Sequence, residues 1–340
     1  MDTKNIGTGR DECRVPLYLS VPLEVPYTVG VGVSDFCNFK CIYCAHSLPS
    51  SDRRKEKMLS FREFAKIADD LKELCNINNV KIKNFSICGT GEPLTCKNLP
   101  QMVEYAKEGD FSERIEITTN GSLLTHELSD KLIDAGLTRL LVSIQGINAD
   151  AYNRICGYDI NFEKLIDEIR YFYEHKKQCK IYIKTLDIAL KENEKEQFYD
   201  IFSPIADMVN IEHMEEVFEG VDYNSIVSEK SLKQTRYGYA WQNRKCCEAM
   251  FMRMNINTDG TVDACGCHQP ALSIGNMHRK SLKQIWNGDL HRRYMEMHLT
   301  GNRKKIKVCK DCDIMSLGGH PMDDLDGHLE DILKKVKNME

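Results

Sequence analysis

Short β-rich runs alternate with longer amphipathic stretches six times between residues 27 and 213. The apolar residues after Ser60 and after Asn161 recur at helical spacing, and Ser60 with Glu63 forms a capping box. This alternation predicts an α/β fold with parallel strands and right-handed crossovers, although it suits a doubly wound sheet and a partial barrel equally. The predicted strands are 27–33, 84–88, 114–119, 139–144, 180–186 and 208–212.

The alternation stops after residue 213, and the 340 residues exceed the ~250–300 at which a single hydrophobic core usually stops growing. We therefore expect a large α/β unit followed by a smaller C-terminal domain. The expected regions are an N-terminal extension (1–26), the α/β unit (27–213), a linker (214–245), a cysteine-rich domain (246–320) and a C-terminal helix (321–340).

The composition excludes several classes of protein. Hydrophobic residues make up 42% of the chain and charged residues 29%, which is ordinary for a soluble globular protein. The formal net charge of −5 argues against nucleic-acid binding, which favours a basic surface. No apolar run approaches the ~20 residues of a membrane span, and the first residues lack a secretory signal. We expect a cytoplasmic protein without a membrane or nucleic-acid partner.

The chain contains 15 cysteines, and many of them are grouped. In a reducing compartment, cysteines at short spacings bind metal or take part in catalysis more often than they form disulfides. An early group consists of Cys37, Cys41 and Cys44, and a late group of Cys246, Cys247, Cys265, Cys267, Cys309 and Cys312. The others are interpreted chiefly as small buried side chains: Cys13, Cys75, Cys88, Cys96, Cys156 and Cys179.

The early group directly follows the first predicted strand. Three thiolates within eight residues can surround one small, soft metal centre. A four-iron cluster held in this way keeps one iron open for a ligand from outside the protein, since such clusters usually have four cysteine ligands. The alternative is a structural zinc site with His46 as the fourth ligand.

The C-x3-C-x2-C spacing, with Tyr43 before the last cysteine, resembles that of the radical S-adenosylmethionine (SAM) enzymes. The resemblance implies a partial (β/α)6 TIM-like barrel, in which SAM binds the open iron and Glu92 binds its amino group. Ligand sites in such barrels lie at the carboxyl ends of the strands. Gln145 stands where many relatives have Asp. The implied SAM-binding residues are Tyr43, Gly89, Thr90, Gly91, Glu92, Thr119, Asn120, Ser143 and Gln145.

The late group, with the segments 255–265 and 274–287, resembles the SPASM or twitch extension of these enzymes. That resemblance implies one auxiliary 4Fe–4S cluster and therefore two clusters in total. Its expected ligands are Cys247, Cys265, Cys309 and Cys312, with Cys246 or Cys267 as replacements. A zinc ribbon is the alternative, but the separation of Cys247 from Cys265 is wide for one.

The resemblance also implies the chemistry. A reduced cluster transfers one electron to SAM, and the resulting 5′-deoxyadenosyl radical removes a hydrogen atom from the substrate. A single auxiliary cluster resembles that of dehydrogenases in this superfamily that oxidise an aminocyclitol alcohol. We expect an oxidoreductase acting on a small polar substrate, such as a sugar or aminocyclitol, with flavodoxin or ferredoxin as reductant. Lys184 and His213 are candidates for the base or substrate clamp.

Three other functions stay open. An epimerase would use Cys156 or Cys267 as hydrogen-atom donor. A peptide-modifying enzyme would usually carry a peptide-recognition domain, for which the residues before the first strand are few. A non-enzymatic iron–sulfur or zinc regulatory protein would not need the Gly91-Glu92 loop.

Overall fold

A computed structural model describes residues 14–49, 56–226, 235–266, 270–317 and 319–339 of the chain. These residues form one nine-stranded sheet with the order β6-β5-β4-β3-β2-β1-β7-β8-β9. The strands are β1 (Thr28–Val31), β2 (Asn84–Ile87), β3 (Ile115–Thr119), β4 (Arg139–Ile144), β5 (Lys180–Leu186), β6 (Met208–Glu212), β7 (Arg253–Ile256), β8 (Thr261–Asp263) and β9 (Ser273–Asn276).

The α-helices of the described residues are mostly short, and none is both long and apolar enough to cross a membrane. They are α1 (Leu17–Ser20), α2 (Phe61–Asn78), α3 (Leu99–Gly109), α4 (His126–Asp134), α5 (Ala149–Cys156), α6 (Phe162–His175), α7 (Lys195–Phe202), α8 (Ala249–Met252), α9 (Leu282–Trp286), α10 (Asp289–Leu299), α11 (Ile314–Leu317) and α12 (Leu329–Lys337).

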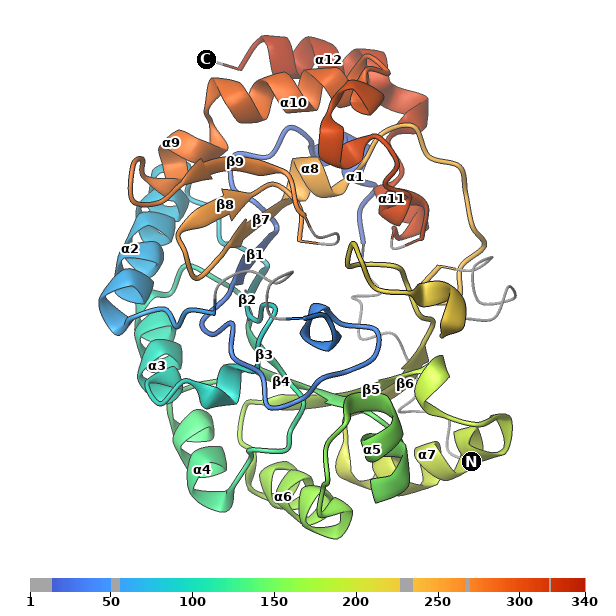
Figure 1. The fold of residues 1–340 in the computed structure, drawn as a ribbon. Coiled ribbons are helices and arrows are strands. Elements are labelled where there is room, and N and C mark those ends of the chain that lie inside the picture. The colour runs from blue at the N-terminus through green and yellow to red at the C-terminus, as the bar shows by residue number, and fades with distance from the viewer. Residues whose placement is uncertain (1–13, 50–55, 227–234, 267–269, 318, 340) are drawn as a thin grey trace.

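The strand order resolves the choice that the sequence pattern left open. Strands β1 to β6 are parallel and lie in chain order, without the reversal of a doubly wound sheet. Right-handed crossovers then place every connecting helix on the same face. Figure 1 shows helices α2, α3, α4, α6 and α7 around the outside of a curved sheet. Residues 28–212 therefore form the expected partial (β/α)6 barrel.

Local sequence signals explain the barrel elements. Ser60 and Glu63 form the expected capping box at the start of α2, and the Asn161 side chain caps α6. Apolar side chains in register make a row across the sheet, since Val29 pairs with Phe85 and Phe85 with Ile115. The Phe85 ring meets the Phe64 ring of α2 edge to face, with centroids 6.0 Å apart. Burial of this row against the helices stabilises the barrel wall.

The cysteine-rich C-terminal region continues the sheet of the barrel. Strand β7 pairs in parallel with β1, and β8 and β9 follow antiparallel. The N-terminal extension also packs against the C-terminal half, because Trp286 Nε1 donates a hydrogen bond of 3.0 Å to the Leu23 carbonyl. The Arg14 guanidinium contacts both carboxylate oxygens of Asp323 at 2.7 Å. The two halves of the chain thus share one sheet.

Candidate active site

The early cysteines lie in the loop that leaves the carboxyl end of β1. Cys37, Cys41 and Cys44 are each partly exposed, and the Cys37 thiol lies within electrostatic range of the other two. Burial raises the pKa of Cys37 to about 12. A bound metal centre would offset this penalty, because thiols bind metals as thiolates.

Cys41 is fixed against the end of helix α5. The backbone N–H groups of Lys40 and Ile42 donate to the carbonyls of Cys156 and Ile155, each at 2.9 Å. A hydrogen bond with the Cys156 thiol, together with burial, raises the pKa of Cys41 well above its ordinary value. Cys156 itself is fully buried, and its thiol donates to the Tyr152 carbonyl at 2.9 Å. This position argues against Cys156 as a hydrogen-atom donor to substrate.

His46 does not complete a zinc site with the three early cysteines. Its Nε2 donates a hydrogen bond of 2.8 Å to the Thr90 carbonyl. Within the described part of the chain, no three His, Cys, Asp or Glu side chains are arranged to hold a single metal ion. In a four-iron cluster each cysteine binds a different iron, so its thiols need not converge on one point.

The Gly89–Glu92 loop packs directly on the cysteine loop. A Cβ atom on Gly91 would lie 2.4 Å from the Ser34 carbonyl oxygen and 2.6 Å from that of Phe36. The Glu92 N–H donates to the Phe36 carbonyl at 2.7 Å, and Thr90 Oγ1 donates to Asp35 at 2.9 Å. Glycine at position 91 is therefore required by contact with the protein's own backbone.

The Glu92 carboxylate is buried and bridges two strand ends. Its Oε1 accepts from the Thr119 hydroxyl at 2.6 Å and from the Leu94 N–H at 3.0 Å, and its Oε2 accepts from the Asn120 N–H at 2.8 Å. Burial raises the pKa of Glu92, although these hydrogen bonds lower it in part. A second acceptor position on Oε2 is unused by these bonds and suits an ammonium group.

Two further contacts join the cysteine loop to strand ends. Asn120 Nδ2 donates to Asn38 Oδ1 at 2.9 Å, and the Tyr43 hydroxyl donates to Gln145 Oε1 at 2.5 Å. Gln145 Nε2 in turn donates to the Ser143 carbonyl at 3.1 Å. The structure therefore brings together the residues expected to bind SAM after β2, β3 and β4.

Lys184 and His213 each pair with a carboxylate at the ends of β5 and β6. Lys184 Nζ lies 2.8 Å from Glu212 Oε2, and the side chains of Lys184 and Glu212 are 19% and 2% exposed. His213 Nδ1 donates to Asp187 Oδ2 at 3.0 Å. In the neutral imidazole this bond leaves Nε2 as the proton acceptor. The geometry thus favours His213 over Lys184 as a base.

The late cysteines line a mostly apolar cavity. Cys247, Cys265, Cys309 and Cys312 all border it, whereas Cys246 does not. Burial and the neighbouring Cys312 together raise the pKa of Cys309 to about 11. Four thiols around an apolar space are a suitable donor set for a four-iron cluster. Cys267, the other expected alternative, lies outside the described residues.

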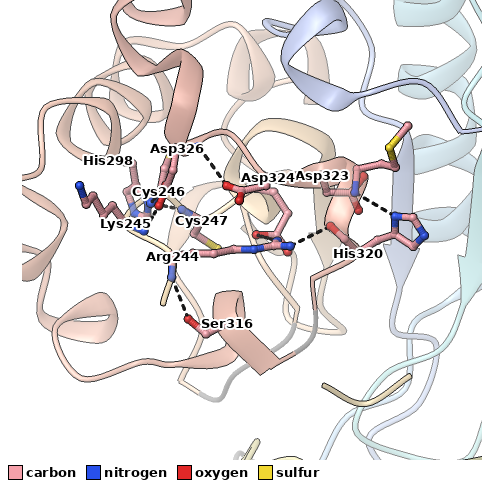
Figure 2. Close-up of polar contacts among 12 residues, drawn as sticks. Arg244, Lys245, Cys246, Cys247, His298, Ser316, His320, Asp323, Asp324 and Asp326 are labelled. Carbon is pink, nitrogen blue, oxygen red and sulfur yellow. Dashed lines mark hydrogen bonds and ion pairs between the residues drawn. The ribbon is translucent and has the colours of Figure 1, made fainter. Parts of the chain in front are cut away.

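Polar contacts fix the backbone that carries Cys247, as Figure 2 shows. Asp326 accepts from the N–H groups of Lys245 at 2.8 Å and Cys246 at 3.0 Å. The Cys247 N–H donates to His298 Nδ1 at 3.3 Å. Sequence reasoning missed His298, because a single histidine on an amphipathic helix carries no recognisable signal.

A charged cavity lies between the barrel and the late cysteines. Its lining includes Glu215, Arg236, Glu248 and Arg253, and it shares Cys247 with the cysteine-lined cavity. It also shares Val217 and Gly266 with a cavity at Gly89 and Thr90. Glu215 Oε2 lies 3.0 Å from Arg236 Nε, while Glu215 Oε1 is buried without a hydrogen-bond partner among the described residues. Sequence reasoning missed these residues because they lie in or beside the expected linker.

Comparison with known proteins identifies the class of enzyme that this arrangement defines. The radical SAM superfamily model matches residues 31–202, and the iron–sulfur cluster-binding domain called SPASM matches residues 246–313. The chain belongs to the radical SAM superfamily and carries a SPASM domain. Its cofactors are accordingly SAM and two 4Fe–4S clusters, for which the two groups of cysteines are suitable ligands.

Relatives in sequence match part of the chain. GTP 3′,8-cyclase of Staphylococcus haemolyticus is 35% identical over 145 residues, which are 42% of this chain and 40% of that protein. The corresponding enzyme of Staphylococcus aureus is 34% identical over 145 residues, which are again 42% of this chain and 40% of that protein. The chain thus matches less than half the length of these curated relatives.

Solved structures share the fold over most of the chain. BtrN in complex with AdoMet and 2-DOIA has a TM-score of 0.54 and 19% identity, covering 85% of this chain and 93% of BtrN. SuiB of Streptococcus suis bound to S-adenosylmethionine has a TM-score of 0.61 and 17% identity, covering 90% and 76%. Native anSMEcpe with bound AdoMet has a TM-score of 0.60 and 14% identity, covering 92% and 100%.

Proposed function

We propose that this enzyme oxidises a small polar substrate, such as an amino sugar or aminocyclitol, at a carbon that bears a hydroxyl group. The observation that carries this proposal is the charged cavity of Glu215, Arg236 and Glu248, which borders both the Gly89-Thr90 cavity and the Cys247 cavity. Its buried carboxylates favour a substrate rich in hydroxyl or ammonium donors. The fold of this chain is similar to that of BtrN, whose structure is a complex with AdoMet and 2-DOIA.

The cofactors, when bound, supply a radical that takes one hydrogen atom and a cluster that accepts one electron. The chain's own residues then have three tasks. Glu215 and Arg236 hold the polar groups of the substrate, the Asp187–His213 pair accepts the hydroxyl proton, and the loops after β2 and β3 hold SAM. A hydrogen atom, a proton and an electron together account for the two hydrogens that the alcohol loses.

The proposal is tested with anaerobically reconstituted protein, SAM and dithionite in deuterated water. We expect 5′-deoxyadenosine and a product that is two mass units lighter and carries no deuterium at the oxidised carbon, since that carbon has become a carbonyl. The probes are a panel of aminocyclitols and amino sugars, with the corresponding deoxy compounds as controls. Replacement of Cys309 and Cys312 by Ser should abolish oxidation and leave some cleavage of SAM.

The same experiment separates the other candidates. A product of unchanged oxidation level that carries one solvent deuterium would favour the epimerase, with Cys267 as the donor to test first. Products formed only from peptides would favour a peptide-modifying enzyme. Peptides are included as probes because SuiB, which shares the fold, has a structure with its precursor peptide SuiA. Absence of 5′-deoxyadenosine with every probe would favour a regulatory iron–sulfur protein.

A further inference from the structure

His298 lies on helix α10 and faces the cavity that the four late cysteines border. The side chain is 1% exposed, and the cavity lining includes His298 together with Cys247, Cys265, Cys309 and Cys312. Its Nε2 atom is buried and has no hydrogen-bond partner among the residues that the structure describes. A buried polar atom without a partner is unfavourable, so a partner is expected inside this cavity.

The backbone decides which nitrogen of His298 carries the proton. The Cys247 N–H donates to Nδ1, so Nδ1 must be unprotonated. A neutral imidazole then carries its hydrogen on Nε2 and offers a donor there. The same bond argues against His298 as an iron ligand through Nε2, because a ligating nitrogen must present a lone pair.

The rest of the cavity leaves this donor few other partners. Met250, Leu272, Val308 and Ile314 provide apolar walls. Arg303 is a donor only, and its Nη1 already donates to the carbonyls of Cys309 and Cys312. The sulfur atoms of a cluster held by the four thiolates are therefore the acceptors within the cavity.

We propose that His298 donates a hydrogen bond from Nε2 to the sulfur of the auxiliary cluster and thereby raises its reduction potential. The inference rests on the ligand set Cys247, Cys265, Cys309 and Cys312 of the proposed function. Hydrogen bonds to sulfur tune the potentials of iron–sulfur clusters, and a donor favours the more negative, reduced state. His298 is thus a positioning and tuning residue that makes the cluster a better acceptor of the substrate's electron.

The first test compares His298→Leu with His298→Gln. We expect His298→Leu to decrease the equilibrium constant for one-electron reduction of the auxiliary cluster about tenfold, which corresponds to a fall of about 59 mV in its midpoint potential. His298→Gln keeps an N–H donor and should restore most of the potential. The SAM-binding cluster of the same molecules is the internal control, and its potential should not change. Equal auxiliary potentials in the parent and the leucine variant would overturn the inference.

The second test uses the parent protein and so does not depend on folding of a variant. In protein labelled with 15N-histidine, pulsed EPR of the reduced auxiliary cluster should show a weak 15N coupling and an exchangeable proton that deuterated water removes. A strong 15N coupling, typical of a direct ligand, or no coupling would each overturn the inference. About four iron atoms per chain instead of about eight would overturn the ligand set and the inference with it.

Discussion

The Oε2 atom of Glu92 accepts a hydrogen bond of 2.8 Å from the backbone N–H of Asn120, which joins the loop after β2 to the loop after β3. The buried carboxylate of Glu92 thus helps to position both loops. The same group is the one that we expect to bind the amino group of SAM, so its structural and binding roles must be separated by experiment.

Replacing Glu92 by Gln should weaken SAM binding roughly ten- to a hundredfold, because a charge-assisted hydrogen bond contributes about 1.5–3 kcal/mol. Binding is measured by equilibrium dialysis with the iron content determined in parallel. Glu116→Gln is the matched control, since Glu116 is a buried barrel carboxylate that bonds Ser86 and pairs with Arg139. Parent-like SAM affinity in Glu92→Gln would show that the carboxylate only bridges the loops.

Replacing Cys37, Cys41 and Cys44 together by Ala should remove about four of about eight iron atoms and all cleavage of SAM. Iron and sulfide analysis and the yield of 5′-deoxyadenosine are the measurements. A triple Ala variant of Cys75, Cys96 and Cys179 is the control, because these buried thiols should affect stability without affecting iron. Unchanged iron in the first variant would contradict the assignment of the SAM-binding cluster.

Gly91→Ala should destabilise the fold by about 1–3 kcal/mol, as overpacking usually does. The new Cβ would meet the backbone carbonyls of Ser34 and Phe36, which cannot move without shifting the cysteine loop. Urea unfolding and iron content both report the effect. Gly327→Ala is the control, since a Cβ there meets nothing within 4 Å. Equal losses of unfolding free energy in the two variants would show that the cysteine loop accommodates the new Cβ without strain.

Glu215→Gln should increase the KM for an amine-bearing substrate with little change in SAM affinity. Glu215 is buried and holds Arg236, so the variant removes a charge from the wall of the proposed substrate cavity. The measurement is product formation against substrate concentration, and Glu216→Gln, on an exposed neighbour, is the control. An unchanged KM would place the substrate elsewhere.

Most of the barrel could be predicted from sequence because each of its elements carries a local signal. The predicted strand at 180–186 agrees with β5 (Lys180–Leu186), and the predicted capping box at Ser60 begins α2. The strand order was not predictable from the alternation of strands and helices alone, since a barrel and a doubly wound sheet both have that alternation. The family resemblance implies the barrel, and the strand order from β6 to β1 is that of a barrel.

The charged cavity and the tautomer of His298 could not be predicted. Glu215, Arg236 and Glu248 meet through tertiary packing, and no spacing in the chain indicates that they do. The tautomer of His298 is set by the hydrogen bond from the Cys247 N–H, which forms only in the folded protein. The grouped cysteines were recognisable because metal ligands cluster along the sequence as well as in space.

The parallel pairing of β7 with β1 also bears on how the protein is made. During synthesis β1 emerges early, but its outer edge gains a partner only after residues 253–256 have left the ribosome. Until then this edge of β1, beside the three early cysteines, stays open to pairing with other chains, which is a risk for aggregation. The C-terminal region therefore covers the edge strand beside the N-terminal cysteines only at the end of translation. Chains truncated before β7 should be insoluble when they are produced.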